Sequence, residues 1–245
     1  MLRKKEREAN TAASKKKVRP DICLSVGCDD PAGLKAEIEK YSDCFRHIDW
    51  QVDKAGDKEW FNRETFTAVI RDIKASFPGK KLMISYRAKG TKGSRILSWA
   101  IGHADMISIR YDDPTMRELL RSARLKGTTS IISFRSFNKM PSSDELATAF
   151  IKMERLGADI LEIACLAETE EQTYTLLQAS GSYTQLRNHK PVIAVAMGEE
   201  GQASRICAGD FGSVITYGCG EAPTAPGQFN VRDLKKYLDT YYESR

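Results

Sequence analysis

The sequence lacks the features that mark membrane, secreted and metal-binding proteins. No apolar run reaches the roughly 18 residues that a membrane helix needs, and no apolar segment near the N-terminus resembles a signal peptide. The six cysteines are scattered, with no CxxC pair and no histidine cluster beside them. This spacing favours structural thiols over a zinc or redox site, so we predict a cytoplasmic protein with no metal and no membrane partner.

Basic charge is concentrated at one end of the chain. The net charge is +5, but residues 1–19 alone hold eight Lys or Arg against two Glu. Residues 20–245 hold 30 basic and 31 acidic residues and are nearly neutral. We therefore predict a disordered basic tail over 1–19, with contact to an anionic surface as the alternative reading. For the remainder, the charge gives no support to nucleic-acid binding.

Two kinds of apolar pattern alternate along residues 20–245. Short β-branched or alternating runs predict strands at 21–26, 47–53, 81–86, 105–110, 129–134, 160–164, 191–196 and 212–217. Apolar residues three or four apart predict helices at 31–41, 60–76, 95–101, 114–126, 142–156, 168–187 and 231–241. The helix at 168–187 is expected to break at Gly181. Eight strands alternating with helices, with no repeat and no linker, predict an α/β fold, a single (β/α)8 TIM barrel.

The segment 129–164 places two charged residues where barrel enzymes carry their chemistry. It reads as one strand–helix–strand unit, with Arg135 beside the end of its first strand and Glu162 within its second. In parallel α/β folds, active sites form at the carboxyl ends of the strands. Because the two strands are neighbours, an ion pair between Arg135 and Glu162 is expected, either as a structural bridge or as part of a binding site.

Several motifs make the sequence more specific than its periodicity. In the last third, Ala196-Met-Gly198 is followed by Ser204-Arg205, Phe211-Gly-Ser213 and the loop Ala222-Pro-Thr-Ala-Pro-Gly-Gln228. This succession resembles the type I 3-dehydroquinate dehydratases, which carry an SRL turn, an FGS strand start and an (S/T)APGQ loop. The resemblance extends upstream over about residues 20–240, through Ile48-Asp-Trp-Gln-Val-Asp53, Ser85-Tyr-Arg87 and Leu156-Gly-Ala-Asp159.

The resemblance implies a barrel enzyme of the shikimate pathway that dehydrates 3-dehydroquinate without a metal or other cofactor. In that family, a lysine on the sixth strand forms a Schiff base with the substrate ketone, and a histidine at the end of the fifth strand moves protons. Members of the family are often dimeric, so a homodimer is expected here.

This sequence departs from the family pattern at both of those positions. The family motif SxHDF appears as Ser133-Phe-Arg-Ser-Phe137, so Arg135 takes the place of the histidine. The motif GADxxKxA appears as 157–164, so Glu162 takes the place of the lysine. A carboxylate cannot form an imine, and a guanidinium is a poor general base because it stays protonated. Further departures are Asp49 and Gln51 on the second strand and Arg110 on the fourth.

The residues implied to bind substrate are better retained. Arg87, Arg205, Thr224 and Gln228 match family positions that hold the substrate's carboxylate and hydroxyls, and Arg205 suits a carboxylate because its planar fork bonds in two places. With Asp49 and Arg110, they form the predicted substrate-binding set. The cations Arg87, Arg110, Arg135 and Arg205 would then surround one barrel mouth, with Asp49 and Glu162 as counter-charges.

Two functions remain open from the sequence. The first is a binding or regulatory protein that cannot perform Schiff-base dehydration and holds a small anionic ligand, a carboxylate or phosphate such as a quinate- or shikimate-like acid. Fungal quinate-pathway repressors with dehydratase-like domains offer a parallel. The second is an active 3-dehydroquinate dehydratase, or another lyase of the shikimate or quinate pathway, that uses altered acid/base residues such as Glu162 or Asp49. A lysine from a loop, such as Lys89, Lys92 or Lys139, would be an alternative amine.

Overall fold

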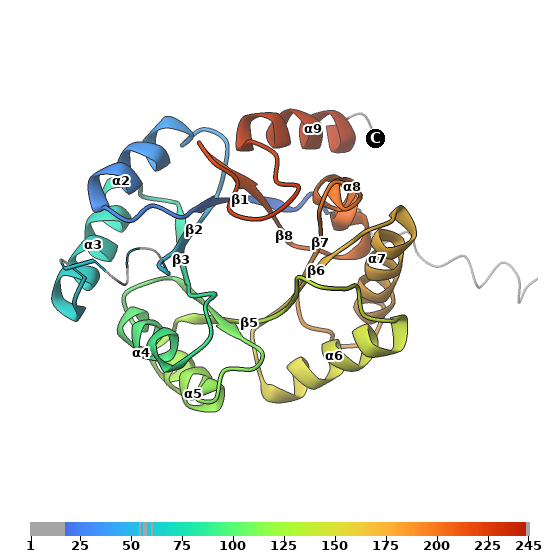
Figure 1. Cartoon of the computed structure of the whole chain (residues 1–245), viewed down its shortest axis with the longest axis horizontal. Helices are drawn as coiled ribbons and strands as arrows, with labels where there is room; N and C mark the ends of the chain where they lie inside the picture. The colour runs from blue at the N-terminus through green and yellow to red at the C-terminus, as the bar shows by residue number, and fades with distance from the viewer. Residues whose placement is uncertain (1–17, 54, 56–57, 60, 244–245) are drawn as a thin grey trace, which may run out of the picture.

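Eight parallel strands form one sheet in the computed structural model, which describes residues 18–53, 55, 58–59 and 61–243 (Figure 1). Their order is β7-β6-β5-β4-β3-β2-β1-β8, so each strand except at the seam lies beside its neighbour in sequence. The strands are β1 (Asp21–Val26), β2 (His47–Gln51), β3 (Lys81–Ser85), β4 (Met106–Arg110), β5 (Thr129–Ser136), β6 (Ile160–Leu166), β7 (Val192–Met197) and β8 (Ile215–Cys219). A parallel bridge between Val192 and Ser213 brings the two edges of the sheet together, which confirms the predicted (β/α)8 barrel.

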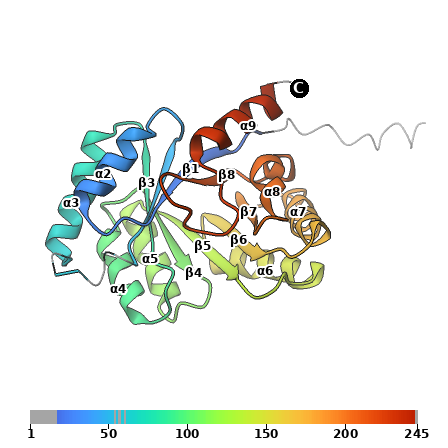
Figure 2. The same ribbon diagram turned by 45° about the horizontal axis from the view of Figure 1, so that its top comes forward.

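Helices surround this barrel as an outer ring (Figure 1). They are α2 (Pro31–Lys40), α3 (Arg63–Ser76), α4 (Thr91–Ala100), α5 (Met116–Lys126), α6 (Ser143–Leu156), α7 (Glu170–Thr184), α8 (Gln202–Cys207), the 3₁₀ turn η2 (Ala208–Phe211) and α9 (Val231–Glu243). The segment between β8 and α9 arches over the carboxyl ends of the strands (Figure 2). It thereby closes part of the barrel mouth.

The apolar residues divide into two layers, as strand alternation requires. Outward-facing residues such as Leu24, Trp50 and Ile163 pack against the helices and form the larger cluster. Inward-facing residues such as Met83 and Ile193 fill the barrel interior in a smaller cluster. Because the interior is packed at this level, polar inward-facing side chains can gather only nearer the carboxyl ends of the strands. The fold therefore positions the site at the mouth.

Local sequence explains where the helix of the 129–164 unit begins and ends. Ser142 accepts a hydrogen bond from the backbone of Glu145, and the Glu145 side chain accepts one from the backbone of Ser142, so α6 begins with a capping box. Gly157 ends the helix in the left-handed region at φ 88°. These two caps fix the register in which β6 returns to the sheet, and so the depth at which Glu162 enters the barrel.

Some predicted boundaries were wrong. Helix α7 continues through Gly181, where a side chain would lie 3.3 Å from Phe211, so this glycine permits close packing of η2 rather than a helix break. Helix α4 begins at Thr91 instead of 95, and β8 begins at Ile215 instead of 212, because Gly212 turns the chain at φ 90°. The short helix α8 and the turn η2 were not predicted.

The predicted tail falls mostly outside the described residues, since 1–17 are not among them. Its last two positions, Val18 and Arg19, are described, and Arg19 forms an ion pair with Asp239 of α9. Across the described part of the chain, no helix is long and apolar enough to cross a membrane.

Candidate functional site

Arg135 and Glu162 form the ion pair that the sequence predicted. An Arg135 Nη2 atom lies 3.0 Å from Glu162 Oε2 and 3.2 Å from Oε1. The two residues are not directly opposite, because strand pairing places Ser133 against Glu162 and Arg135 against Ala164. Arg135 therefore reaches back towards the barrel interior, and its Nε donates to the Ser133 hydroxyl at 2.7 Å. This hydroxyl was not singled out from the sequence, although its inward-facing position on β5 follows from strand alternation.

Burial and charge compete at Glu162. Its side chain is only 2% exposed, and this burial alone would raise its pKa, but Arg135, a hydrogen bond from Ser133 and the charge of Arg87 together lower the pKa below its ordinary value. Burial would lower the pKa of Arg135, yet Glu162, Tyr217 and Asp49 raise it. Both groups are therefore charged at neutral pH, and Glu162 is a weak base.

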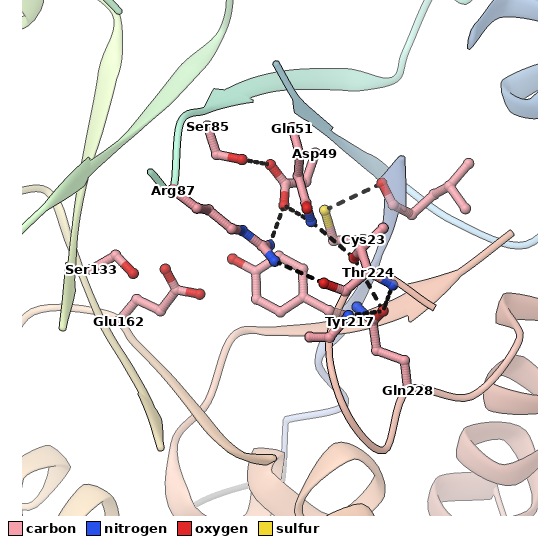
Figure 3. Close-up of polar contacts among 12 residues, drawn as sticks. Cys23, Asp49, Gln51, Ser85, Arg87, Ser133, Glu162, Tyr217, Thr224 and Gln228 are labelled. Carbon is pink, nitrogen blue, oxygen red and sulfur yellow. Dashed lines mark hydrogen bonds and ion pairs between the residues drawn. The ribbon is translucent and has the colours of Figure 1, made fainter. Parts of the chain in front are cut away.

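A second ion pair lies on the neighbouring side of the mouth (Figure 3). Arg87 Nη2 lies 3.1 Å from Asp49 Oδ2, and the fully buried Asp49 also accepts from Ser85 at 2.5 Å and from Gln51 at 3.3 Å. The backbone of Arg87 is held by Asp53, which accepts hydrogen bonds at 3.0 and 2.9 Å. Burial and the nearby Arg135 lower the pKa of Arg87, against the opposite effect of Asp49. The structure thus brings Asp49 and Arg87 together, as predicted residues of one site.

The loop after β8 is joined to this pair. Thr224 Oγ1 accepts a hydrogen bond from Gln51 at 2.9 Å, and its carbonyl oxygen lies 3.5 Å from Arg87 Nη1. Gln228 Oε1 accepts from the Thr224 backbone at 2.7 Å, from the Thr224 hydroxyl at 3.1 Å and from the Ala225 backbone at 3.0 Å. Gln228 therefore fixes the loop, and Thr224 connects it to the second strand.

Arg205 lies deeper than the other predicted cations. It is 1% exposed, and its guanidinium donates to the carbonyl of Tyr217 at 3.2 Å and to that of Pro226 at 2.8 Å. Burial lowers the pKa of Arg205 to about 10. In this arrangement, Arg205 joins β8 to the loop that arches over the mouth.

Two cavities open at the mouth, one on each side of Arg87. The first, of about 330 Å³, lies over β3 to β5 and is lined by Arg87, Lys89, Arg110, Tyr111, Asp112, Ser133, Phe134, Arg135, Ser136, Phe137 and Asn138. The second, of about 400 Å³, lies over β1, β2 and the loop after β8 and is lined by Gly27, Cys28, Glu37, Gln51, Asp53, Arg87, Glu221, Ala222, Pro223 and Thr224. Four cations and one acid line the first cavity. Asp49 and Glu162 neutralise two of these cations, which leaves four positive against three negative charges, a net charge of +1 that favours an anionic group.

Arg110 lines the first cavity and forms an ion pair with Asp112. Its guanidinium pairs with Asp112 at 2.6 Å and donates to the carbonyl of Arg87 at 2.6 Å. Arg110 lowers the pKa of Asp112, against a smaller opposing effect of burial. The sequence analysis named Lys89 only as an alternative amine, and it missed Asp112 and the aromatic wall of Tyr111 and Phe137. Loop residues carry no periodic signal of the direction in which they point.

Several buried polar atoms around the mouth have no hydrogen-bond partner among the described residues. They are Ser25 Oγ, Arg87 Nε, Arg205 Nε and the Tyr217 hydroxyl. Ser25 is paired in register with Asp49 and Cys219, so it faces the same region as the second ion pair. The charges of Glu162 and Asp49 act on Tyr217, whose pKa is raised first by burial and then by these acids. Such atoms are normally satisfied by water or a polar ligand, because leaving them unpaired costs about 1–3 kcal/mol each.

Comparisons with known proteins agree with this architecture. A model of the type I 3-dehydroquinase family matches residues 22–245. The chain belongs to the type I 3-dehydroquinase family. A 3-dehydroquinate dehydratase from Clostridioides difficile strain 630 is 26% identical over 240 residues, which cover 92% of this chain and 93% of that protein. One from Escherichia coli K12 is 27% identical over 239 residues, which cover 92% of this chain and 94% of that protein.

Solved structures show the same fold. A crystal structure of type I 3-dehydroquinate dehydratase from Clostridium difficile, with covalently modified comenic acid, matches with a TM-score of 0.83 at 24% identity and covers 93% of this chain and 94% of that one. A 3-dehydroquinate dehydratase from Geobacillus kaustophilus has a TM-score of 0.83 at 21% identity, with coverage of 95% and 99%.

Other residues of the catalytic types, lysine and histidine, occur both away from the mouth and at it. Lys152 is exposed on the outer helix α6, and His47 stands at the start of β2, at the opposite end of the barrel. Of the loop lysines considered, Lys89 lines the first cavity and is exposed at its rim. Among the described residues, one group offers metal-ligating atoms within 4.8 Å of one another, namely Cys28, Asp29 and Asp30. Asp30 already caps α2, so this group does not indicate a metal site.

Proposed function

We propose that this protein is a member of the type I 3-dehydroquinase family that does not perform Schiff-base dehydration and binds a small anion at the barrel mouth. The observation that carries the proposal is Glu162, which is buried and ion-paired to Arg135 at 3.0 Å. The family resemblance implies a lysine at this position and a histidine at that of Arg135. A carboxylate cannot condense with a ketone, and a guanidinium held in a buried ion pair does not exchange protons near neutral pH.

The cationic cavity supports the ligand class. Arg87, Lys89, Arg110 and Arg135 line it, and Ser133, Ser136 and Asn138 add hydroxyl and amide groups. A carboxylate or phosphate would accept charge-assisted hydrogen bonds from the guanidinium groups. The buried Tyr217 hydroxyl has no hydrogen-bond partner among the described residues, which suits a ligand that also carries hydroxyls, such as a quinate- or shikimate-like acid.

An active lyase is the alternative, and the position of Lys89 in the first cavity is the observation that favours it. Lys89 is exposed, whereas Glu162 and Arg135 are largely buried and paired with each other. The available bases are also poor candidates, since the pKa of Glu162 is lowered and Asp49 accepts three hydrogen bonds. We therefore favour binding without turnover.

Calorimetric titration with 3-dehydroquinate, shikimate and a small sugar phosphate tests the binding half of the proposal. We expect at least one to bind, and Arg110→Gln to weaken that binding about tenfold or more, because a hydrogen bond to a charged group contributes about 1.5–3 kcal/mol. Arg124→Gln is the matched control, since Arg124 lies at the opposite end of the barrel and donates to Gly157. The absence of heat with all three ligands would reject the proposed ligand class.

A spectroscopic assay tests the catalytic half. Dehydration of 3-dehydroquinate creates a conjugated product that absorbs in the ultraviolet, and we expect no increase in absorbance above the uncatalysed rate. The double variant Glu162→Lys with Arg135→His should not reach full turnover, because Asp49, Gln51 and Arg110 also differ from the family pattern. Turnover by the unaltered protein, abolished by Lys89→Met, would establish the alternative.

A further inference from the structure

We propose that a groove on the outside of the barrel binds the chain's own basic segment, residues 1–17. The groove lies between α7, α8 and the end of α9, which stand together on one side of the barrel (Figure 2). Its volume is about 670 Å³, and it is lined by Glu170, Thr173, Tyr174, Leu177, Glu199, Glu200, Ala203, Cys207, Asp210, Phe211 and Tyr241. None of these residues belongs to the mouth, so the proposal is independent of the proposed function.

The groove combines an apolar floor with an acidic rim. Leu177 and Phe211 form part of the floor, and Tyr174 is 63% exposed above it. Glu170, Glu199, Glu200 and Asp210 contribute four acidic groups, while none of the eleven described residues that line the groove is basic. A peptide that fits this surface would carry several cations and small apolar side chains.

The described chain starts at the edge of this groove. Val18 packs against η2 so closely that a side chain at Gly209 would lie 2.3 Å from the Val18 carbonyl oxygen. Gly209 is followed directly by Asp210 and Phe211, which line the groove. The ion pair of Arg19 with Asp239 fixes this short segment on α9. Val18, the first described residue, therefore lies next to the groove.

Residues 1–17 have the composition that the groove requires. They carry seven Lys or Arg against two Glu, and Leu2, Ala9, Ala12 and Ala13 supply apolar side chains. For a random coil of 17 residues, the root-mean-square span is about 23 Å. The stretch of α7 from Glu170 to Leu177 is only about 10 Å long. The tether is thus long enough, and it holds the segment at an effective concentration in the millimolar range.

Photo-crosslinking of the full chain tests the proposal. A benzophenone amino acid replaces Ala12, and mass spectrometry of the monomer fraction maps the crosslinked peptides. We expect crosslinks to peptides that contain Tyr174 or residues 199–211. The variant Glu170→Gln/Glu199→Gln/Glu200→Gln should lower their yield about tenfold, since three exposed charge pairs are lost. Glu39→Gln/Glu64→Gln/Glu118→Gln is the control, because it removes the same charge from exposed positions on α2, α3 and α5.

Three crosslinking results are possible, and each either supports or overturns the proposal. Intramolecular crosslinks to the groove that fall only in the first triple variant support the proposal. Crosslinks between two copies, seen as covalent dimers, would overturn the proposal, because the groove would then bind the segment of a second copy and not the chain's own. Crosslinks scattered over the surface, or a groove yield equal in both triple variants, would overturn it.

Discussion

Breaking the Arg135–Glu162 pair from one side should destabilise the barrel strongly. Arg135→Met keeps much of the side chain's volume but leaves the Glu162 carboxylate, 2% exposed, without its cation. Removing one partner of a buried pair costs about 3–5 kcal/mol. For a domain of this size, each kcal/mol lowers Tm by about 2–4 °C, so we expect a decrease of at least about 6 °C.

Removing both partners should cost much less. In Arg135→Met/Glu162→Met, no uncompensated charge remains, and apolar replacement of a buried ion pair is often neutral. We expect the double variant to recover at least half of the stability lost in the single variant. A double-mutant cycle completed with Glu162→Met gives the coupling free energy directly.

The loss in Arg135→Met should also depend on pH. In the unaltered protein, the pKa of Glu162 is lowered, so its contribution to stability is present above the unfolded-state pKa of about 4.3 and is lost as pH falls through the folded-state pKa. In the variant, burial dominates and raises the pKa. The folded variant then holds a proton that the unfolded chain releases, and stability falls by about 1.4 kcal/mol per pH unit above about 4.3 until the raised pKa is reached.

Urea unfolding at pH 4.5, 5.5 and 6.5 measures both effects. The difference between the unaltered protein and Arg135→Met should increase across this range, whereas the double variant should follow the unaltered protein. A difference that is independent of pH, or a single variant as stable as the double, would refute the buried ion pair as we describe it.

Three further changes test other parts of the structure. Gly201→Ala should cost about 2 kcal/mol or more in urea unfolding, because its side chain would lie 2.3 Å from the carbonyl oxygen of Ala196; an unchanged stability would contradict this packing. Burial raises the pKa of Cys165 to about 12, so a thiol reagent at pH 8 should modify it only after unfolding, which peptide mapping can follow; rapid labelling in the native protein would show that the thiol is accessible. Tyr217→Phe removes a buried hydroxyl with no partner among the described residues, so stability without ligand should be unchanged or raised by up to about 1 kcal/mol, while calorimetry should show weaker ligand binding. A Tm lowered by several degrees in Tyr217→Phe would indicate that the hydroxyl already has a partner.

The fold and the Arg135–Glu162 ion pair could be predicted from the sequence. Strand alternation places Glu162 and Arg135 on the inner face of neighbouring strands, and parallel strands carry such residues to one end of the barrel. The pairing offset between β5 and β6 was not predictable, because it depends on the caps that set where α6 ends. That offset is what sends Arg135 back towards Ser133 as well as Glu162.

The contacts of Arg205 and Arg110 could not be predicted from the sequence, for a different reason. Arg205 binds the carbonyls of Tyr217 and Pro226, and any residue type can offer a carbonyl, so side-chain chemistry gives no indication of the pairing. Arg110 pairs with Asp112 two residues later, a contact that depends on the turn after β4. The sequence therefore identified most charged residues of the mouth and the Arg135–Glu162 pair, but not the partners of Arg110 and Arg205.

Borohydride reduction in the presence of 3-dehydroquinate tests the central claim most directly. Borohydride converts an imine into a stable secondary amine, so any Schiff base between the protein and the substrate ketone appears as an increase in intact mass. With Glu162 ion-paired to Arg135 at the base of the mouth, we predict an unchanged mass at saturating 3-dehydroquinate. A stoichiometric adduct that maps to Lys89 or to another single lysine would contradict the account.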